Sequence, residues 1–245
     1  MNLFVLSEYG QREVTMKAVD SIQREDPQAV IYIGNDAFPG KTRAATRNPA
    51  IRVINQPVNV GYVKNTNKTA EIALLHFGAE IGIIPIADNA ILFICNNDII
   101  FHPGSIEKLS QYAAEHDAVV GPTLTIPTHY QLIHPQFQHA GDPVRKGEPR
   151  PIRMLSGCCL VMKARIWLDI GGLDEDYHWY YTDDQFCIDA VAKGYESIYM
   201  PEAVIDHNVG KTMRRNRAMM RMIREDRELF AKKNPDLQWS KSGEY

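Results

Sequence analysis

Short apolar runs alternate with helix-like segments along most of the chain. Runs at residues 3–6, 29–33, 51–54 and 91–95 have the length and composition of buried strands. Between them, residues 14–24 and 66–77 carry apolar side chains at helical spacing. Strands that alternate with helices in this way predict an α/β fold, in which a mostly parallel central sheet is flanked by helices.

The second half of the chain continues this pattern less regularly. We expect helices at 105–115 and 184–193, and strands at 118–121, 152–162 and 196–200. The strand at 152–162 is interrupted by Gly157, where the missing Cβ allows a close approach to the backbone, and the last strand ends at Pro201. Residues 122–150 hold five prolines and three histidines with little periodicity. They predict a long loop or small hairpin insertion, which is either a substrate lid on the acceptor side or a structural arm.

Length and composition favour one large domain or a domain with an appendage. The chain has 245 residues, of which 44% are hydrophobic, and its apolar runs are shorter than the roughly 18 residues that span a bilayer. The first residues also lack a basic region before an apolar one, so we expect a cytoplasmic protein. Its four cysteines show no CxxC spacing, which favours buried free thiols.

The charge is distributed unevenly. The net charge is −3, but residues 211–233 carry nine basic and three acidic side chains, which leaves the remainder acidic. We therefore predict a basic helical C-terminal extension over 211–245. It is either an amphipathic helix packed on the domain or a surface that meets anionic lipid at the membrane. Nucleic acid is not an expected partner because the rest of the chain is acidic.

Two carboxylate positions are candidates for chemistry. The strand at 91–95 ends in Asn96-Asn97-Asp98, and a carboxylate at the end of a buried strand either holds a divalent cation or forms a turn. Asp183 and Asp184 stand at an expected helix start, where they either cap free amides or supply a general base. His207 follows a strand and, taken alone, is more typical of a structural histidine.

An aromatic run precedes Asp183 and Asp184. Residues 177–181 read Tyr-His-Trp-Tyr-Tyr, and five such side chains in a row cannot all point into a core. Aromatic faces exposed beside a carboxylate suit stacking on sugar rings.

The order of several short motifs resembles the family 2 inverting glycosyltransferases of the GT-A fold, particularly their rhamnosyltransferase-like bacterial members. The resemblance covers nearly the whole chain up to about residue 210. It is carried by Asn59-Val60-Gly61 with Asn67, Asn96-Asn97-Asp98, Ser156-Gly157-Cys158-Cys159-Leu160-Val161, Gly171-Gly172-Leu173-Asp174-Glu175, Thr182-Asp183-Asp184, Gly194-Tyr195 and His207. It departs from the family pattern at Thr182, at Asn96 and in Gly34-Asn35-Asp36.

The resemblance implies a GT-A domain over 1–210 and a role for each matching residue. Asp98 would hold Mn²⁺ or Mg²⁺, with His207 as a further ligand or a contact to the diphosphate. Asp183 would be the general base, with Asp184 as the fallback. The residues implied on the nucleotide and donor side are Asp36, Asn59, Gly61, Asn67, Asn96, Asn97 and Lys211. Those implied on the acceptor side are Gly157, Trp179, Tyr180 and Tyr181.

The implied reaction moves a sugar from a UDP, GDP or dTDP donor to a hydroxyl of a glycan or lipid-linked acceptor, with inversion. One alternative is a nucleotidyltransferase that makes sugar nucleotides, although residues 7–12 offer a single glycine where such an enzyme needs a glycine-rich loop. The other is a non-catalytic carbohydrate- or nucleotide-binding scaffold on the same fold.

Overall fold

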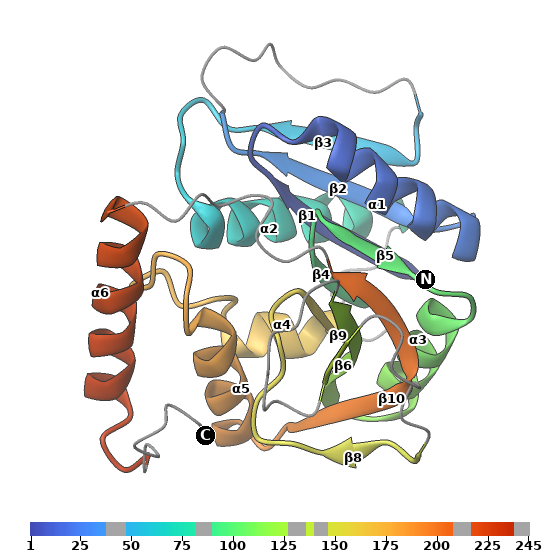
Figure 1. Cartoon of the computed structure of the whole chain (residues 1–245). Helices are drawn as coiled ribbons and strands as arrows, with labels where there is room; N and C mark the ends of the chain where they lie inside the picture. The colour runs from blue at the N-terminus through green and yellow to red at the C-terminus, as the bar shows by residue number, and fades with distance from the viewer. Residues whose placement is uncertain (38–47, 82–89, 127–135, 140–146, 208–216, 238–245) are drawn as a thin grey trace.

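A computed structural model describes residues 1–37, 48–81, 90–126, 136–139, 147–207 and 217–237. A central sheet lies between layers of helices (Figure 1). Its strands follow the spatial order β3-β2-β1-β4-β9-β6-β10-β5, with β7 beside β6 and β8 beside β10. The predicted α/β architecture, a sheet flanked by helices, is confirmed.

The first half of the chain forms a parallel sheet. Its strands are β1 (Asn2–Glu8), β2 (Val30–Asn35), β3 (Ile51–Asn55) and β4 (Ile91–Asn96), and its helices are α1 (Arg12–Glu25) and α2 (Tyr62–Ile81). β1 pairs in parallel with β2 and β4, and β2 pairs in parallel with β3. The four carboxyl ends therefore meet at one edge, where open α/β sheets bind ligands.

The second half adds strands of both directions. Its elements are β5 (Ile99–Phe101), α3 (Ser105–Glu115), β6 (Ala118–Ile126), β7 (Phe137–His139), β8 (Arg150–Pro151), β9 (Cys159–Lys163), α4 (Ala164–Ile170), α5 (Thr182–Ala192), β10 (Glu196–His207) and α6 (Arg217–Lys233). β9 runs antiparallel between β4 and β6, whereas β10 is parallel to β6 and antiparallel to β5. The parallel arrangement thus describes the first half, and the second half is mixed.

Apolar layers on both faces hold the helices against the sheet. On the face covered by α1 and α3, the rings of Phe4 and Phe93 stack with centroids 4.2 Å apart. On the opposite face, α4 and α5 bury Trp167 and Phe186, and α6 adds Phe230 to the same cluster. Apolar burial, at ~25 cal/mol per Å², is the main stabilising contribution to this arrangement.

Several predicted strand boundaries are wrong. The strand expected over 152–162 begins only at Cys159, because the chain turns at Gly157 and directs that residue's amide toward another segment. The strand expected to end at Pro201 continues to His207. A register shift between Met200 and Val204 accommodates the proline, which has no N–H to donate to a neighbouring strand.

Part of the expected insertion at 122–150 belongs to the sheet. Residues 122–126 extend β6, and β7 pairs with β6 in parallel, so these two strands are not a hairpin. Residues 127–135 and 140–146 lie outside the described residues.

The basic C-terminal segment is described from residue 217 to residue 237, where it forms α6 and the turn that follows it. The helix lies along one side of the molecule, beside α5 and the loop that leads into α5 (Figure 1). Within the described residues, no helix combines the length and the apolar character that crossing a membrane requires.

Candidate active site

The pairing of β5 with β10 brings together the two residues predicted to hold a metal. After β4 the chain turns at residues 97–98 and enters β5, whose Ile99 lies opposite His207. This places Asp98 Oδ1 3.4 Å from His207 Nε2, with the two side chains only 6% and 13% exposed. Two residues far apart in the sequence therefore form one buried pair at the sheet edge.

The chemistry of this pair fits a divalent cation. His207 Nδ1 is buried and has no hydrogen-bond partner among the described residues. Burial lowers the pKa of His207, but its contacts with Cys158 and Asp98 outweigh this and raise the pKa to about 10. A cation bound here must therefore displace a proton.

A carboxylate oxygen and an imidazole nitrogen are donors that Mn²⁺ accepts, with water and phosphate oxygens completing its shell. No group of three or more His, Cys, Asp or Glu side chains in the described part of the chain is placed to hold a metal. The residues present thus fit a cation that takes two ligands from this part of the protein.

The two asparagines before Asp98 face different surroundings. Asn96 Nδ2 lies 3.4 Å from His207 Nε2, so it belongs to the same group as the Asp98–His207 pair. Asn97 is buried, and its Nδ2 donates to Thr15 Oγ1 over 3.0 Å. Its amide nitrogen therefore fastens the end of β4 to α1.

Asp183 lies in the first turn of α5 and is held by the backbone of Gly157. The Gly157 amide donates to Asp183 Oδ2 over 2.6 Å. A Cβ at position 157 would lie 2.8 Å from the Cβ of Asp183, closer than real Cβ contacts allow. Glycine at position 157, predicted to contact the acceptor, is therefore required for this close approach. Asp184 lies in the same turn and is partly exposed.

Several contacts join Asp183 to the Asp98–His207 pair. The Asn96 amide donates to the carbonyl of Cys158, which connects the end of β4 to the Gly157 turn. Cys158 raises the pKa of His207, and both Cys158 and Asp183 add to a rise in the pKa of Tyr62 that comes mainly from burial. The hydrogen bonds of Gly157 and Cys158 thus place Asp183 in the same neighbourhood as the end of β4.

Tyr62 is a residue of this site that sequence reasoning missed. Its ring stacks on that of Trp179, with centroids 5.1 Å apart, and both side chains are partly buried. Its position directly after the Asn59-Val60-Gly61 motif is the one sequence feature that could have drawn attention to it.

Three residues predicted on the nucleotide side form a cluster beyond β2. The Asp36 carboxylate accepts hydrogen bonds from the amides of Val60 and Gly61, over 2.7 and 3.0 Å. Asn59 Nδ2 donates to the Asp36 carbonyl over 3.4 Å. Burial raises the pKa of Asp36, although these two amide bonds oppose the rise. Asp36 thus stabilises the loop that leads into α2.

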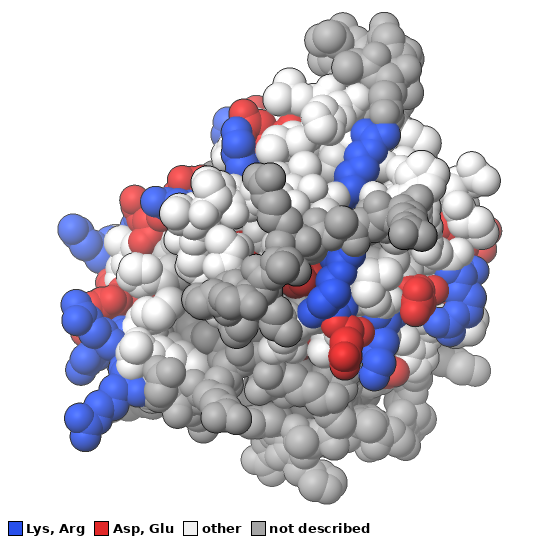
Figure 2. All heavy atoms as spheres, turned by 90° about the horizontal axis from the view of Figure 1, so that it is seen from above, with Lys and Arg blue, Asp and Glu red and all other residues white. Residues whose placement is uncertain are grey.

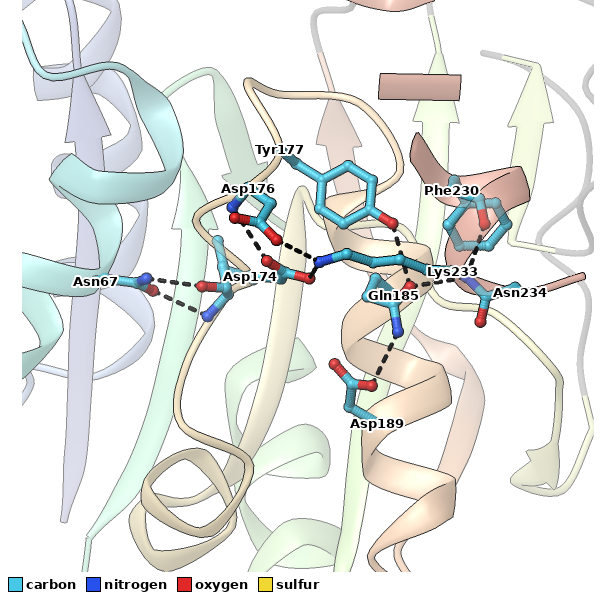
Figure 3. A network of polar contacts seen from close by, with 10 residues as sticks. Asn67, Asp174, Asp176, Tyr177, Gln185, Asp189, Phe230, Lys233 and Asn234 are labelled. Carbon is cyan, nitrogen blue, oxygen red and sulfur yellow. Dashed lines mark hydrogen bonds and ion pairs between the residues drawn. The ribbon is translucent and has the colours of Figure 1, made fainter. Parts of the chain in front are cut away.

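Asn67 lies away from this cluster and joins two of the sequence motifs. Its side-chain amide donates to the carbonyl of Leu173 over 2.8 Å and accepts from the Leu173 amide over 2.9 Å (Figure 3). The described contacts of Asn67 are therefore with the loop at 171–175 and connect that loop to α2. Lys211 lies outside the described residues.

The aromatic run divides between the site and the core. Tyr177 is buried, Trp179 stacks on Tyr62, and Tyr181 stacks on Phe230 of α6 with centroids 5.1 Å apart. The amide of Tyr180 donates to Asp226.

The four cysteines are free and buried, as predicted, and the Sγ atoms of Cys95 and Cys159 are 3.8 Å apart.

Comparison with known sequences points to sugar transfer. The chain matches no family model. Two relatives from strains of Mycobacterium tuberculosis, both named N-acetylglucosaminyl-diphospho-decaprenol L-rhamnosyltransferase, are 27% identical over 216 residues. The match covers 77% of this chain and 69% of each relative. The resemblance to rhamnosyltransferase-like proteins is thereby confirmed, and it supports a glycosyltransferase function.

Solved structures decide the fold. GalNAc-T7 with UDP, GalNAc and Mn²⁺ matches with a TM-score of 0.66 and 12% identity, over 85% of this chain and 44% of that one. The mannosyltransferase PcManGT from Pyrobaculum calidifontis, in complex with GDP-Man and Mn²⁺, matches with a TM-score of 0.64 and 14% identity. This match covers 97% of this chain and 65% of the mannosyltransferase chain. The chain has the GT-A glycosyltransferase fold. This GT-A chain spans less than two thirds of the length of either structure.

Replacing Gly157 with alanine tests how Asp183 is held. The new methyl group must push Asp183 away, so we expect its carboxylate to leave the Gly157 amide in a crystal structure of Gly157→Ala. We also expect the free energy of unfolding in urea to fall by about 1–3 kcal/mol. Ser156→Ala, which adds no atoms, is the control and should keep Asp183 in place. An unmoved Asp183 in Gly157→Ala would contradict the packing described.

Proposed function

We propose that this GT-A chain is an inverting glycosyltransferase that uses a nucleotide-diphosphate sugar. The observation that carries the proposal is a carboxylate, Asp183, fixed by the Gly157 amide in the same neighbourhood as the Asp98–His207 pair. A site of this kind combines a proton acceptor with two residues suited to a cation. The rhamnosyltransferase relatives support the same reaction class.

Mn²⁺ or Mg²⁺ is the proposed cofactor, and Asp98 and His207 would hold it. A bound cation supplies positive charge to a departing diphosphate. Both solved structures compared above contain Mn²⁺. The imidazole of His207 favours Mn²⁺ over Mg²⁺, which prefers oxygen ligands.

In the proposed reaction, Asp183 accepts the proton of the acceptor hydroxyl as that oxygen attacks the anomeric carbon of the donor sugar. The bond from this carbon to the diphosphate breaks with its electron pair, so the nucleoside diphosphate leaves with the added negative charge. Attack from the face opposite the diphosphate inverts the anomeric centre. Asp184, in the same helical turn, is the second candidate for the base.

The donor and acceptor are proposed by class. The loop shaped by Asp36, Asn59 and Gly61 would line the pocket for a UDP, GDP or dTDP sugar. The stacked rings of Tyr62 and Trp179, with Tyr180 nearby in sequence, would flank a hexose or deoxyhexose on the acceptor side. The relatives' name specifies a lipid-diphosphate acceptor, and we propose a glycan or lipid-linked saccharide here.

A lipid-linked acceptor would require the protein to work at a membrane surface, and α6 offers a basic face for this contact. Arg217, Arg224 and Arg227 are exposed on the helix and form no ion pair within the described residues. In Figure 2, Lys and Arg side chains gather at the left edge, the side on which α6 lies in Figure 1, with acidic side chains among them. Juxtamembrane arginines attract anionic lipid headgroups.

The base is tested by Asp183→Asn. We expect transfer to an acceptor to fall at least about a hundredfold, because the amide cannot accept the hydroxyl proton, while nucleotide affinity stays unchanged. The measurements are the turnover rate and calorimetric nucleotide binding. Asp184→Asn is run in parallel, and it identifies the base if it shows the larger loss. Wild-type turnover in both variants would remove these residues from the reaction.

The cation site is tested by calorimetry with UDP, GDP, dTDP and CDP, each with and without Mn²⁺. We expect one nucleotide to bind wild-type protein tightly only with Mn²⁺, and Asp98→Ala to weaken that binding at least tenfold. Asp206→Ala is the control, because it removes a neighbouring carboxylate that pairs instead with His102. Absence of binding by all four nucleotides would favour the non-catalytic scaffold.

The membrane surface is tested by sedimentation with phosphatidylcholine vesicles that contain or lack phosphatidylglycerol. We expect binding only to the anionic vesicles, and a loss of about tenfold in the double variant Arg217→Glu/Arg224→Glu. Lys17→Glu/Arg24→Glu on α1 makes the same charge change on another helix and should bind as wild type. Equal losses in both variants would indicate an effect of net charge alone.

A further inference from the structure

The C-terminal helix α6 is bonded directly to the segment that leads into α5. The Asp226 carboxylate is 1% exposed and accepts hydrogen bonds from three consecutive backbone amides. These are the amides of His178, Trp179 and Tyr180, at 2.9, 2.9 and 2.8 Å. A buried carboxylate is costly unless its oxygens are hydrogen-bonded, and here three donors from one loop meet that need.

Tyr181, the residue after these three amides, has an unusual backbone conformation and contacts α6. Tyr181 has a φ of 62°, in the left-handed region that non-glycine residues seldom occupy. Its ring stacks on Phe230 of α6, with an interplanar angle of 27°. This stack lies one turn after Asp226 on the helix, so α6 holds both the amides before Tyr181 and the ring of Tyr181 itself.

Further contacts fasten the C-terminal end of α6. The Lys233 ammonium pairs with Asp174 and Asp176, the second at 2.7 Å, and the Asn234 amide donates to Gln185 of α5 over 2.8 Å (Figure 3). The Tyr177 hydroxyl donates to the same Gln185 oxygen over 3.1 Å. The helix is thus fixed both to the loop before α5 and to α5 itself.

We infer that Asp226 is a positioning residue for the catalytic carboxylate. Asp183 follows Tyr181 by two residues, and its carboxylate accepts the amide of Gly157, in the turn before β9. Asp226, on α6, instead holds the backbone of residues 178–180, which lead along the chain into Asp183. One of these amides belongs to Trp179, so Asp226 also positions the residue whose ring stacks on Tyr62. This inference rests on the proposed function of Asp183.

The decisive variant is Asp226→Asn in the full chain, because it keeps the shape of the side chain. The amide offers one acceptor oxygen, and its NH₂ group faces backbone N–H donors. Glu228→Gln is the matched control, since it removes an exposed carboxylate two residues further along α6. For both variants we would measure turnover, acceptor KM, calorimetric nucleotide binding, melting temperature and hydrogen exchange of residues 177–181.

We expect Asp226→Asn to lower kcat about tenfold or more and to speed hydrogen exchange at 178–180, with nucleotide Kd within twofold of wild type. Glu228→Gln should match wild type throughout. A merely structural role would lower the melting temperature but leave kcat unchanged well below it. A kcat within twofold of wild type in folded Asp226→Asn, or unchanged exchange, overturns the inference.

Two further results are informative. If Asp226→Asn does not fold, Phe230→Leu replaces it, because it keeps an apolar side chain and removes the ring under Tyr181. We then expect kcat to fall at least threefold with unchanged nucleotide binding, and an unchanged kcat overturns the inference. If wild-type protein transfers no sugar from any donor, the proposed function fails, whereas hydrogen exchange still reports whether Asp226 fixes residues 178–180.

Discussion

The hydrogen bond from the Gly157 amide to Asp183 is the contact on which the candidate site depends. It joins the turn before β9 to the first turn of α5, at a distance that leaves no room for a side chain on residue 157. The next residue, Cys158, connects through its carbonyl to Asn96 at the end of β4. Through these two bonds, the strand that ends beside Asp98 and the helix that carries Asp183 share one short turn.

Buried or partly buried carboxylates recur in this protein as acceptors for backbone amides. Asp36 holds the amides of Val60 and Gly61, Asp183 holds that of Gly157, and Asp226 holds three in succession. Each satisfies donors in a loop that has no strand or helix to pair with. The loops around the sheet edge are therefore shaped by charged side chains as well as by apolar burial.

Local patterns were enough to predict the α/β fold and most of its elements. Apolar runs located β1 to β4, and the expected helix at 105–115 matches α3, because local composition decides these elements. The closeness of Asp98 and His207 depends on the antiparallel pairing of β5, a three-residue strand too short to give a periodic pattern. The bulge at Pro201 and the late start of β9 arise from contacts with distant segments, which no local pattern encodes. The role of Asp226 was not predicted, because this residue lies within a segment that is mostly basic.

The connection between α6 and the loop at 178–180 has a consequence for biosynthesis. The three amides precede their acceptor by 46 to 48 residues in the chain. During synthesis, the ribosome must therefore translate and release the whole of β10 and half of α6 before this loop can reach its native hydrogen bonds. The sheet can assemble earlier, since most of its strands lie upstream. A nascent chain paused in this interval would carry a formed sheet with an unfinished loop before Asp183.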